Sequence, residues 1–190
     1  MELIPGKIQR IAVVGTTGSG KTMTAIELSR RLGISHVELD ALYWGPDWTE
    51  SKTEDFRTQV GEVIKSDSWI VDGNYSVVRD IIWPRAQIVV WLDYSLPIIM
   101  WQLTRRTFRR IILREELWNG CVERFWPQFF SRESIFLWAL KTYRTRRKKY
   151  PELFAKPENA HLSIIRLRSP KMANKWIFNF EIEQKHEITN

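Results

Sequence analysis

Cysteine is almost absent from this chain of 190 residues, in which Cys121 is the single one. One cysteine cannot form an intrachain disulfide, so a reducing compartment is the simplest location. A long hydrophobic run is missing too, because the most apolar region, residues 81–103, is interrupted by Arg85, Asp93 and two prolines. Such a region does not suit a membrane span, and the first residues do not resemble a signal or transit peptide. We therefore expect a cytoplasmic protein with no membrane partner.

Acidic residues are scarce in one block of the sequence. Residues 101–150 contain thirteen Lys or Arg and only four Glu, so this block alone accounts for the whole net charge of +7. A concentration of positive charge favours an anionic partner, which here is either the phosphates of a nucleotide or a nucleic acid backbone.

Short apolar runs rich in β-branched residues alternate along the chain with segments of helical period. This alternation predicts a three-layer α/β fold, with a parallel sheet covered by helices on both faces, in a single domain over residues 1–190. Strands are expected at 8–14, 36–40, 69–71, 87–92 and 161–167, and helices at 21–32, 53–65, 76–82, 97–110 and 170–180.

The alternation breaks down between residues 108 and 134. This stretch contains Gly120, Pro127 and several large aromatic residues, but no strand period. An excursion of this size within a compact domain is usually functional. We expect a helical lid insertion at about 108–134; the alternative is an additional surface helical hairpin without a catalytic part.

One motif carries specific chemistry. The segment Gly15-Thr16-Thr17-Gly18-Ser19-Gly20-Lys21-Thr22 fits the full phosphate-loop pattern, with a predicted strand before it and a predicted helix after it. Its glycines let backbone N–H groups turn toward phosphate oxygens, and the following helix directs its positive N-terminus at them. The Lys21 side chain can reach the β- and γ-phosphates, and the Thr22 hydroxyl can bind Mg²⁺. The motif predicts binding of ATP with Mg²⁺.

A phosphate loop requires an acidic residue nearby to support the Mg²⁺ ion. Asp72 and Asp93 each follow a predicted strand, and the spacing does not choose between them. Asp40 also stands at the end of a predicted strand, and ligands of open α/β sheets bind at the carboxyl ends of the strands. Close to Asp40, the rings of Tyr43, Trp44 and Trp48 are candidates for the wall of an acceptor pocket, or else for packing at the edge of the core.

The phosphate loop and the later Val71-Asp72-Gly73-Asn74 together resemble the adenylate kinase-like phosphate-loop superfamily. The resemblance is closer to the topology modulation, or FlaR-like, branch of that superfamily. It rests on the order of the segments Leu39–Trp44, Trp48, Asp72–Ser76, Pro84–Ala86 and Gly120–Glu123.

The resemblance implies a sheet of order 2-3-1-4-5 and a role for several side chains. It implies that Asp72 is the acid beside the phosphate loop, and that Asp40 faces the acceptor, either as a base or as a group near the Mg²⁺ ion. It further implies that two arginines lie near the acceptor or its phosphate, namely Arg79 and Arg85. Arginines at the base of the lid would stabilise the charge of the transferring phosphoryl group, namely Arg105, Arg106, Arg144 and Arg146.

These features predict a Mg²⁺-dependent kinase that transfers the γ-phosphoryl group of ATP to a small acceptor of nucleotide or metabolite type. The alternative is a nucleic-acid-binding regulator whose nucleotide site acts as a switch. In that case the basic run Lys141–Lys149, with Tyr143 and Tyr150, would follow a phosphate backbone, although no module that reads nucleic acid is recognisable. The periodicity also allows a helix here that buries Leu137, Trp138 and Leu140.

Overall fold

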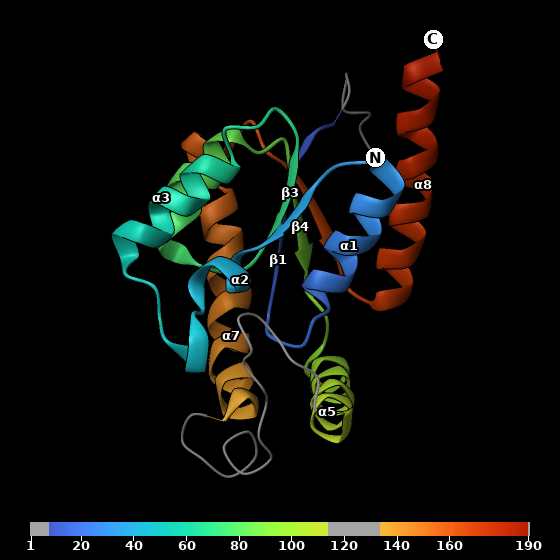
Figure 1. The fold of residues 1–190 in the computed structure, drawn as a ribbon. Coiled ribbons are helices and arrows are strands. Elements are labelled where there is room, and N and C mark those ends of the chain that lie inside the picture. The colour runs from blue at the N-terminus through green and yellow to red at the C-terminus, as the bar shows by residue number, and fades with distance from the viewer. Residues whose placement is uncertain (1–7, 114–133, 190) are drawn as a thin grey trace.

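The computed structural model describes residues 8–113 and 134–189. Its centre is a five-stranded parallel sheet with the strand order β2-β3-β1-β4-β5, which confirms the predicted order (Figure 1). The strands are β1 (Arg10–Gly15), β2 (His36–Glu38), β3 (Trp69–Asp72), β4 (Ile88–Leu92) and β5 (Ser163–Leu167).

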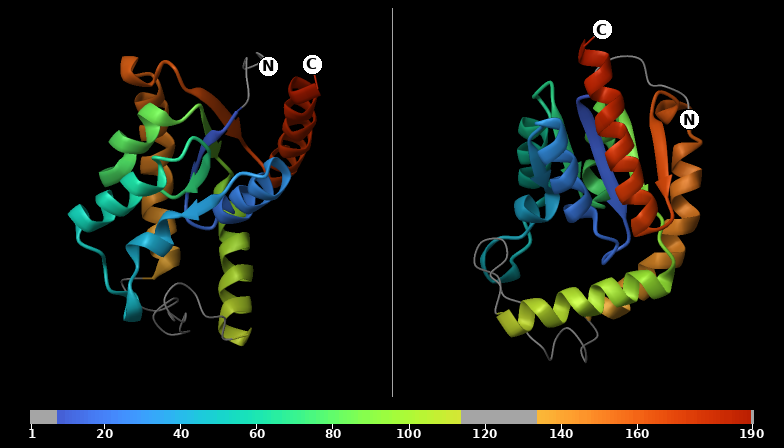
Figure 2. Two further views of the ribbon diagram at one scale, coloured as in Figure 1. Left: turned by 45° about the horizontal axis from the view of Figure 1, so that its top comes forward. Right: turned by 90° about the vertical axis from the view of Figure 1, so that its right-hand side faces the viewer.

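Helices cover both faces of this sheet, so the predicted three-layer α/β architecture is confirmed (Figures 1 and 2). Helices α1 (Lys21–Leu32) and α8 (Pro170–Thr189) cover one face, and α3 (Thr53–Val63) and α7 (Ile135–Phe154) cover the other. The remaining helices are α2 (Leu39–Tyr43), α4 (Arg79–Ile82) and α5 (Leu96–Leu113), and the short 3₁₀ helices are η1 (Pro46–Trp48), η2 (Ser76–Val78), η3 (Trp83–Arg85) and η5 (Pro157–Asn159).

The central strand shows why these strands are continuously apolar in sequence. Ile11 and Val13 of β1 pack into the core beneath α1 and α8, whereas Ala12 and Val14 pack into the core beneath α3 and α7. Successive side chains of a strand point to opposite faces, and here both faces are buried. The sheet is therefore a rigid base, and its carboxyl edge positions the phosphate loop.

Some boundaries differ from the prediction. The second strand ends at Glu38, so Asp40 lies in the first turn of α2 and not at the end of the strand. Residues 108–113 of the expected lid continue helix α5, while residues 114–133 lie outside the described part of the chain.

Helix α7 carries most of the basic run. The expectation that Leu137, Trp138 and Leu140 are buried is wrong, because they are 42%, 54% and 43% exposed. The buried residues of α7 are instead Ala139, near the start of the helix, and Tyr150, near its end, which packs into the core. None of the described helices is long and apolar enough to cross a membrane.

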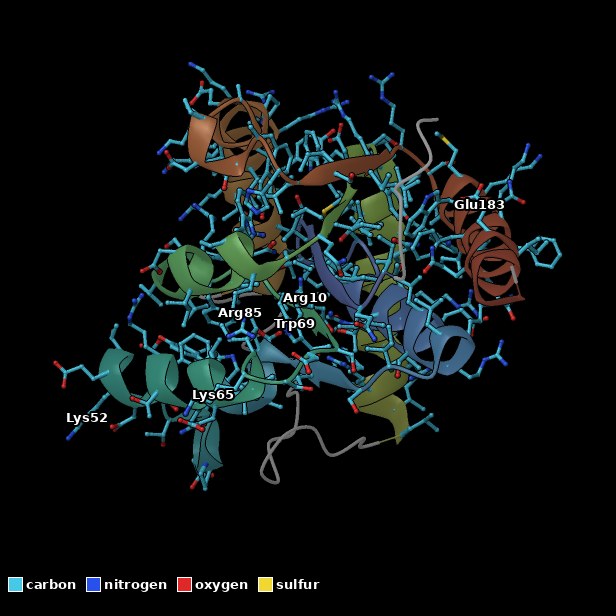
Figure 3. All side chains as sticks on the ribbon, turned by 90° about the horizontal axis from the view of Figure 1, so that it is seen from above. Arg10, Lys52, Lys65, Trp69, Arg85 and Glu183 are labelled. Atoms are coloured by element: carbon cyan, nitrogen blue, oxygen red, sulfur yellow. The ribbon has the colours of Figure 1, made fainter. Side chains whose placement is uncertain are left out.

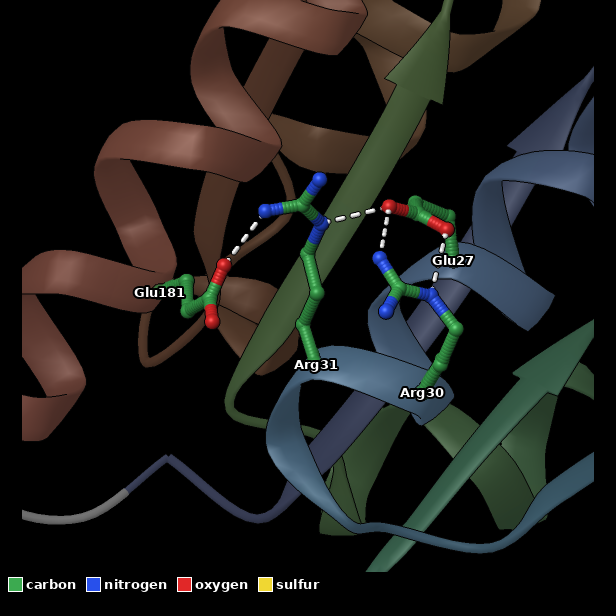
Figure 4. A network of polar contacts seen from close by, with 4 residues as sticks. All are labelled: Glu27, Arg30, Arg31 and Glu181. Atoms are coloured by element: carbon green, nitrogen blue, oxygen red, sulfur yellow. Dashed lines mark hydrogen bonds and ion pairs between the residues drawn. The ribbon is translucent and has the colours of Figure 1, made fainter.

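A network of charged side chains joins the two helices on one face of the sheet (Figure 4). Glu27 of α1 accepts hydrogen bonds from Arg30 at 2.8 and 3.0 Å and from Arg31 at 2.5 Å. Arg31 in turn donates to Glu181 of α8. Hydrogen bonds from Arg30 and Arg31 lower the pKa of Glu27 to about 2.

This network predicts a pH-dependent contribution to stability. A lowered folded-state pKa means that ionised Glu27 stabilises the fold above its ordinary pKa of 4.5, and that this contribution is lost as the pH falls toward 2. We expect Glu27→Gln to lower the thermal unfolding midpoint at about pH 6, and the difference from the wild type to narrow below about pH 4.5. Thermal unfolding monitored by circular dichroism over this range measures it. A difference that stays constant as the pH falls would contradict the assignment.

Candidate functional site

The backbone of the phosphate loop turns sharply between the end of β1 and the start of α1. Gly18 and Gly20 have φ angles of +83° and +84°, in the left-handed region that favours glycine. A Cβ atom on Gly15 would lie 2.8 Å from the carbonyl oxygen of Leu92 in the adjacent strand. The loop therefore requires glycine both for its conformation and for its close approach to β4.

Helix α1 begins directly after the loop, and its N-terminus suits an anion. The first N–H groups of an α-helix have no partner inside the helix and carry partial positive charge. In α1 no side chain caps these groups, and the first turn contains no acidic residue. A bound phosphate would satisfy this helix end.

The hydroxyl group of Thr22 lies between two carboxylates. Its Oγ1 atom donates to Oε1 of Glu38 at 2.9 Å and lies 3.4 Å from Oδ1 of Asp72. Asp72 is almost fully buried, and its other oxygen, Oδ2, lies 2.7 Å from Nε2 of His36. Parallel pairing of β2 with β3 places Glu38 opposite Asp72. Hydroxyl and carboxylate oxygens are the ligands that Mg²⁺ prefers.

The contacts of Asp72 and Asp93 distinguish these two acids, between which the sequence did not choose. Asp72 lies at the phosphate loop, whereas Asp93 is bound by two arginines, at 3.1 Å from Nε of Arg147 and 2.5 Å from Nη2 of Arg166. Asp93 thus links α7 and β5 to the end of β4. Among the described residues, no group of three or more His, Cys, Asp or Glu could hold a metal ion by itself. Magnesium typically completes its coordination with water and nucleotide phosphates, so the Thr22 cluster suits it better than an all-protein cage would.

Positive charge gathers around Lys21. Burial lowers the pKa of the Lys21 ammonium group, the carboxylates of Asp40 and Asp72 raise it, and the guanidinium groups of Arg146 and Arg106 lower it again. Burial also lowers the pKa of Arg146, and the neighbouring Arg79 lowers it further. The cations that influence one another in this way come from four helices, namely Lys21 of α1, Arg79 of α4, Arg106 of α5 and Arg146 of α7.

Arg146 is the cation whose surroundings most clearly call for a ligand. Its Nη1 atom is buried and has no hydrogen-bond partner within the described residues. A buried, unsatisfied guanidinium N–H is costly, and a multivalent anion would satisfy it. The site thus combines an uncapped helix end with the buried Nη1 atom of Arg146, which has no hydrogen-bond partner in the described part of the chain.

Only one member of each predicted pair of lid arginines reaches this site. Arg105 and Arg144 are exposed to solvent, whereas Arg106 and Arg146 are partly buried and influence Lys21. Successive residues of a helix point about 100° apart, so neighbouring arginines cannot share one target. The sequence showed the cluster of arginines but not which face of the helix meets the loop.

Arg85 does not lie near the site, and its prediction as an acceptor-binding residue is wrong. Its carbonyl oxygen accepts a hydrogen bond from Nε of Arg10 at 2.7 Å, and its side chain reaches the carbonyl oxygen of Lys65. Figure 3 shows Arg85 beside Arg10, the first residue of β1. Arg85 ends the 3₁₀ helix η3, which leads into the start of β4, whereas the phosphate loop follows the end of β1. Arg85 and the phosphate loop therefore lie at opposite ends of the parallel strands.

Four consecutive residues, the last of β3 and the three that follow it, each contact a different part of the site. Asp72 faces Thr22, as described above. Gly73 packs so closely on Leu39 that a Cβ atom there would lie 2.8 Å from that side chain. Asn74 bonds to the peptide groups of Gly15, and the Tyr75 hydroxyl donates to Oδ1 of Asp40 at 2.6 Å. Of these four residues, the sequence predicted a role only for Asp72.

The aromatic residues after β2 form one chain of ring contacts. The ring of Tyr43 packs against Phe56 and Tyr75, with centroids 5.2 and 4.7 Å away, so it belongs to the edge of the core. Trp44 meets Tyr43 edge to face at 5.0 Å and Trp48 at 5.8 Å, and all three rings are partly exposed. Trp44 and Trp48 make no ring contact with Phe56 in this chain of contacts, so they stay candidates for the wall of an acceptor pocket.

A narrow cavity of about 20 Å³ lies beside Leu39, and Arg79 lines it together with Asn74, Tyr75 and Tyr150. The guanidinium group of Arg79 lies over the ring of Trp83, 5.1 Å from its centroid. The structure thus brings Arg79 to the cavity next to the segment Asp72–Tyr75, and its part in binding an acceptor stays a prediction.

The cations of the basic run on α7 point in two directions, some toward the protein and some toward solvent. Arg146 faces Lys21 and Arg147 pairs with Asp93, so two of its six cations point toward the protein. The exposed cations that a nucleic acid could contact are Lys141, Arg144, Lys148 and Lys149, together with the exposed part of Arg147.

Solved structures similar to this chain are kinases of small molecules. A gluconokinase from Sinorhizobium meliloti 1021 is 16% identical, with a TM-score of 0.51 over 94% of this chain and 97% of that one. The shikimate kinase from Acinetobacter baumannii, solved with shikimate, is 16% identical, with a TM-score of 0.55 over 91% and 90%. The shikimate kinase from Aquifex aeolicus vf5 is 12% identical, with a TM-score of 0.52 over 95% and 99%.

Identities of this size show the fold, which is that of the P-loop kinases. No protein-family model matches the chain, and no curated protein matches its sequence. The comparisons therefore confirm the phosphate-loop kinase fold but not the topology modulation branch.

The geometry predicts different consequences for the two strand-end acids. Asp72→Asn removes a negative charge beside Thr22, so we expect it to raise the Mg²⁺ concentration needed for half-maximal nucleotide binding by at least about tenfold. Asp93→Asn removes the partner of Arg147 and Arg166, so it should lower the unfolding midpoint and leave the Mg²⁺ requirement nearly unchanged. Nucleotide binding titrated against Mg²⁺, with thermal unfolding in parallel, measures both. The reverse order of Mg²⁺ effects would exchange the two roles.

Proposed function

We propose that this protein is a cytoplasmic, Mg²⁺-dependent phosphotransferase that moves the γ-phosphoryl group of ATP to a small acceptor. The observation that carries the proposal is the buried Nη1 atom of Arg146, which has no hydrogen-bond partner among residues 8–113 and 134–189 and lies close to Lys21 and the uncapped N-terminus of α1. A nucleotide-binding switch needs the loop and its lysine, but an additional buried arginine directed at the same place suits a reaction that develops charge there.

The described residues fit ATP and Mg²⁺. The phosphate loop and the first turn of α1 offer N–H groups to the phosphates, and the side chains of Thr22, Glu38 and Asp72 offer oxygen atoms to the metal. Bound Mg²⁺ would neutralise phosphate charge and orient the phosphates for transfer. Lys21 and Arg146 would hold the phosphates, and Arg106 would add positive charge from α5.

Asp40 is the candidate for the group that accepts a proton. Its carboxylate lies close enough to Lys21 to raise the pKa of that residue, and the hydrogen bond from Tyr75 fixes its orientation. In the proposed step the acceptor hydroxyl gives its proton to Asp40 as its oxygen bonds to the γ-phosphorus. The bond from that phosphorus to the bridging oxygen breaks, and ADP leaves with the electron pair.

Arg79 and Trp44 bear on the acceptor. Arg79 is partly buried, and its charge lowers the pKa of Arg146, so a second anion near it would relieve the repulsion. We infer an acceptor that carries a hydroxyl group and an anionic group, of nucleotide or metabolite type. The kinase names of the structural neighbours and the resemblance to the adenylate kinase-like superfamily and its topology modulation branch support a phosphotransferase of this class.

The first test is the release of ADP from ATP and Mg²⁺ in the presence of a panel of acceptors. The panel contains nucleosides, nucleoside monophosphates and small hydroxylated acids, and the control is Lys21→Ala. We expect one acceptor class to raise turnover at least about tenfold above the hydrolysis seen without an acceptor, because water is then displaced as the competing nucleophile. Equal turnover with every acceptor, or full activity of Lys21→Ala, would refute the proposal.

The two arginines of α7 provide a matched pair for a second test. Arg146→Ala should lower kcat by at least about 100-fold, because a buried charge directed at the transferring group is lost. Its KM for ATP should change by less than about tenfold, since the loop still binds the phosphates. Arg144→Ala, two residues away and exposed, should retain nearly full activity. Steady-state kinetics with the best acceptor measure kcat and the KM for ATP of both variants. A loss of ATP affinity alone in Arg146→Ala would contradict a role in transfer.

A further inference from the structure

The side chain of Asn74 pairs with the first residue of the phosphate loop. The Gly15 N–H group donates to Oδ1 of Asn74 at 3.1 Å, and Nδ2 of Asn74 donates to the carbonyl oxygen of Gly15. The amide thus uses both its acceptor and its donor on one residue of the backbone. Such a two-point contact fixes the orientation of the amide as well as its distance.

Helix α7 joins this contact through a tyrosine. The hydroxyl group of Tyr150 donates to the same Oδ1 atom at 2.8 Å, across 76 positions of the chain. Tyr150 is only 3% exposed. Its ring packs among Trp83, Trp91 and Phe154, with centroids 5.6 to 6.4 Å away. The hydroxyl group is therefore the polar end of a side chain that is otherwise held by aromatic packing.

Arg146 precedes Tyr150 by one helical turn. Residues four apart lie on the same face of a helix, so the contact that orients Tyr150 also sets the direction from which Arg146 approaches Lys21. The N-terminal part of α7 exposes Leu137 and Trp138 but buries Ala139 and contacts α5, so packing there also helps to fix the helix. The end that carries Tyr150 adds the polar contact that relates the rotation of α7 to the phosphate loop.

We propose that Asn74 and Tyr150 are positioning residues, which hold Arg146 in register with the phosphate loop. The inference rests on the proposed phosphotransfer, in which Arg146 acts on the transferring group. Packing alone could keep α7 on the sheet. The three hydrogen bonds of Asn74 add a fixed relation between the loop proposed to hold the phosphates and the helix that carries the arginine. Catalysis is sensitive to displacements of about 1 Å.

The variant that tests this is Tyr150→Phe, which removes the hydroxyl group and keeps the ring. We expect kcat to fall about tenfold, the factor that corresponds to one hydrogen bond, with the KM for ATP unchanged. The matched control is Tyr143→Phe on the same helix, whose hydroxyl group accepts a hydrogen bond from Arg147 at 2.7 Å and does not touch Asn74. This control should retain its kcat. A wild-type kcat in Tyr150→Phe, or an equal loss in both variants, would overturn the proposal.

A double-mutant cycle distinguishes positioning from general damage. If Tyr150 acts through Arg146, then Tyr150→Phe should lower kcat in the wild type but not in an Arg146→Ala background. Equal factors in both backgrounds would show that the hydroxyl group does not act through the arginine, and would refute the inference.

A third readout does not depend on phosphotransfer. We expect Tyr150→Phe to speed amide hydrogen exchange in residues 10–22 and in the C-terminal half of α7, whereas Tyr143→Phe should leave exchange in residues 10–22 unchanged. If the wild type transfers phosphate to no acceptor, the proposed function fails, and exchange still decides whether the link between α7 and the loop exists. Unchanged exchange in residues 10–22 of Tyr150→Phe would show that the link does not restrain the loop.

Discussion

The rest of the site depends on the positive charge that gathers at the N-terminus of α1. The uncapped helix end, Lys21 and Arg146 meet there, with Arg106 nearby, and Asp40 and Asp72 are the carboxylates that raise the pKa of Lys21. Bringing cations together in a partly buried place costs free energy unless an anion is bound. That cost explains why the other features of the site, from the glycine turns to the packing of α7, serve to hold these groups in a fixed arrangement around one ligand.

The parallel sheet provides that arrangement, because the ends of neighbouring strands deliver side chains to one edge. Register pairs Val13 and Glu38 with Asp72, so the phosphate loop, the carboxylates beside Thr22 and the turn after β3 start from the same level. The four residues Asp72 to Tyr75 then distribute contacts to Thr22, Leu39, Gly15 and Asp40. This one segment thus connects Thr22, the phosphate loop and Asp40, and through Tyr150 it also connects α7.

The sequence predicted what depends on local spacing. The phosphate loop, the alternation of strands and helices and, by resemblance, the sheet order follow from patterns within short segments. The features that the sequence could not predict depend on contacts between segments that are far apart in the chain. The choice between Asp72 and Asp93 required the neighbours of each, and the choice of Arg106 and Arg146 required the rotation of two helices. Arg85 was placed wrongly because a position in sequence does not tell which end of the sheet a residue reaches. Glu38 was detectable as an acid two residues before Asp40, whereas the contact between Asn74 and Tyr150 spans 76 positions and left no local signal.

The central claim is that this positive charge binds a nucleoside triphosphate with the metal at Thr22. A crystal structure with Mg²⁺ and a non-hydrolysable ATP analogue tests it most directly. The account predicts that the γ-phosphate lies between Nζ of Lys21 and the guanidinium group of Arg146, and that the metal ion lies at Thr22 and Asp72. A nucleotide bound elsewhere, or an Arg146 side chain turned to solvent while the loop is occupied, would contradict the account.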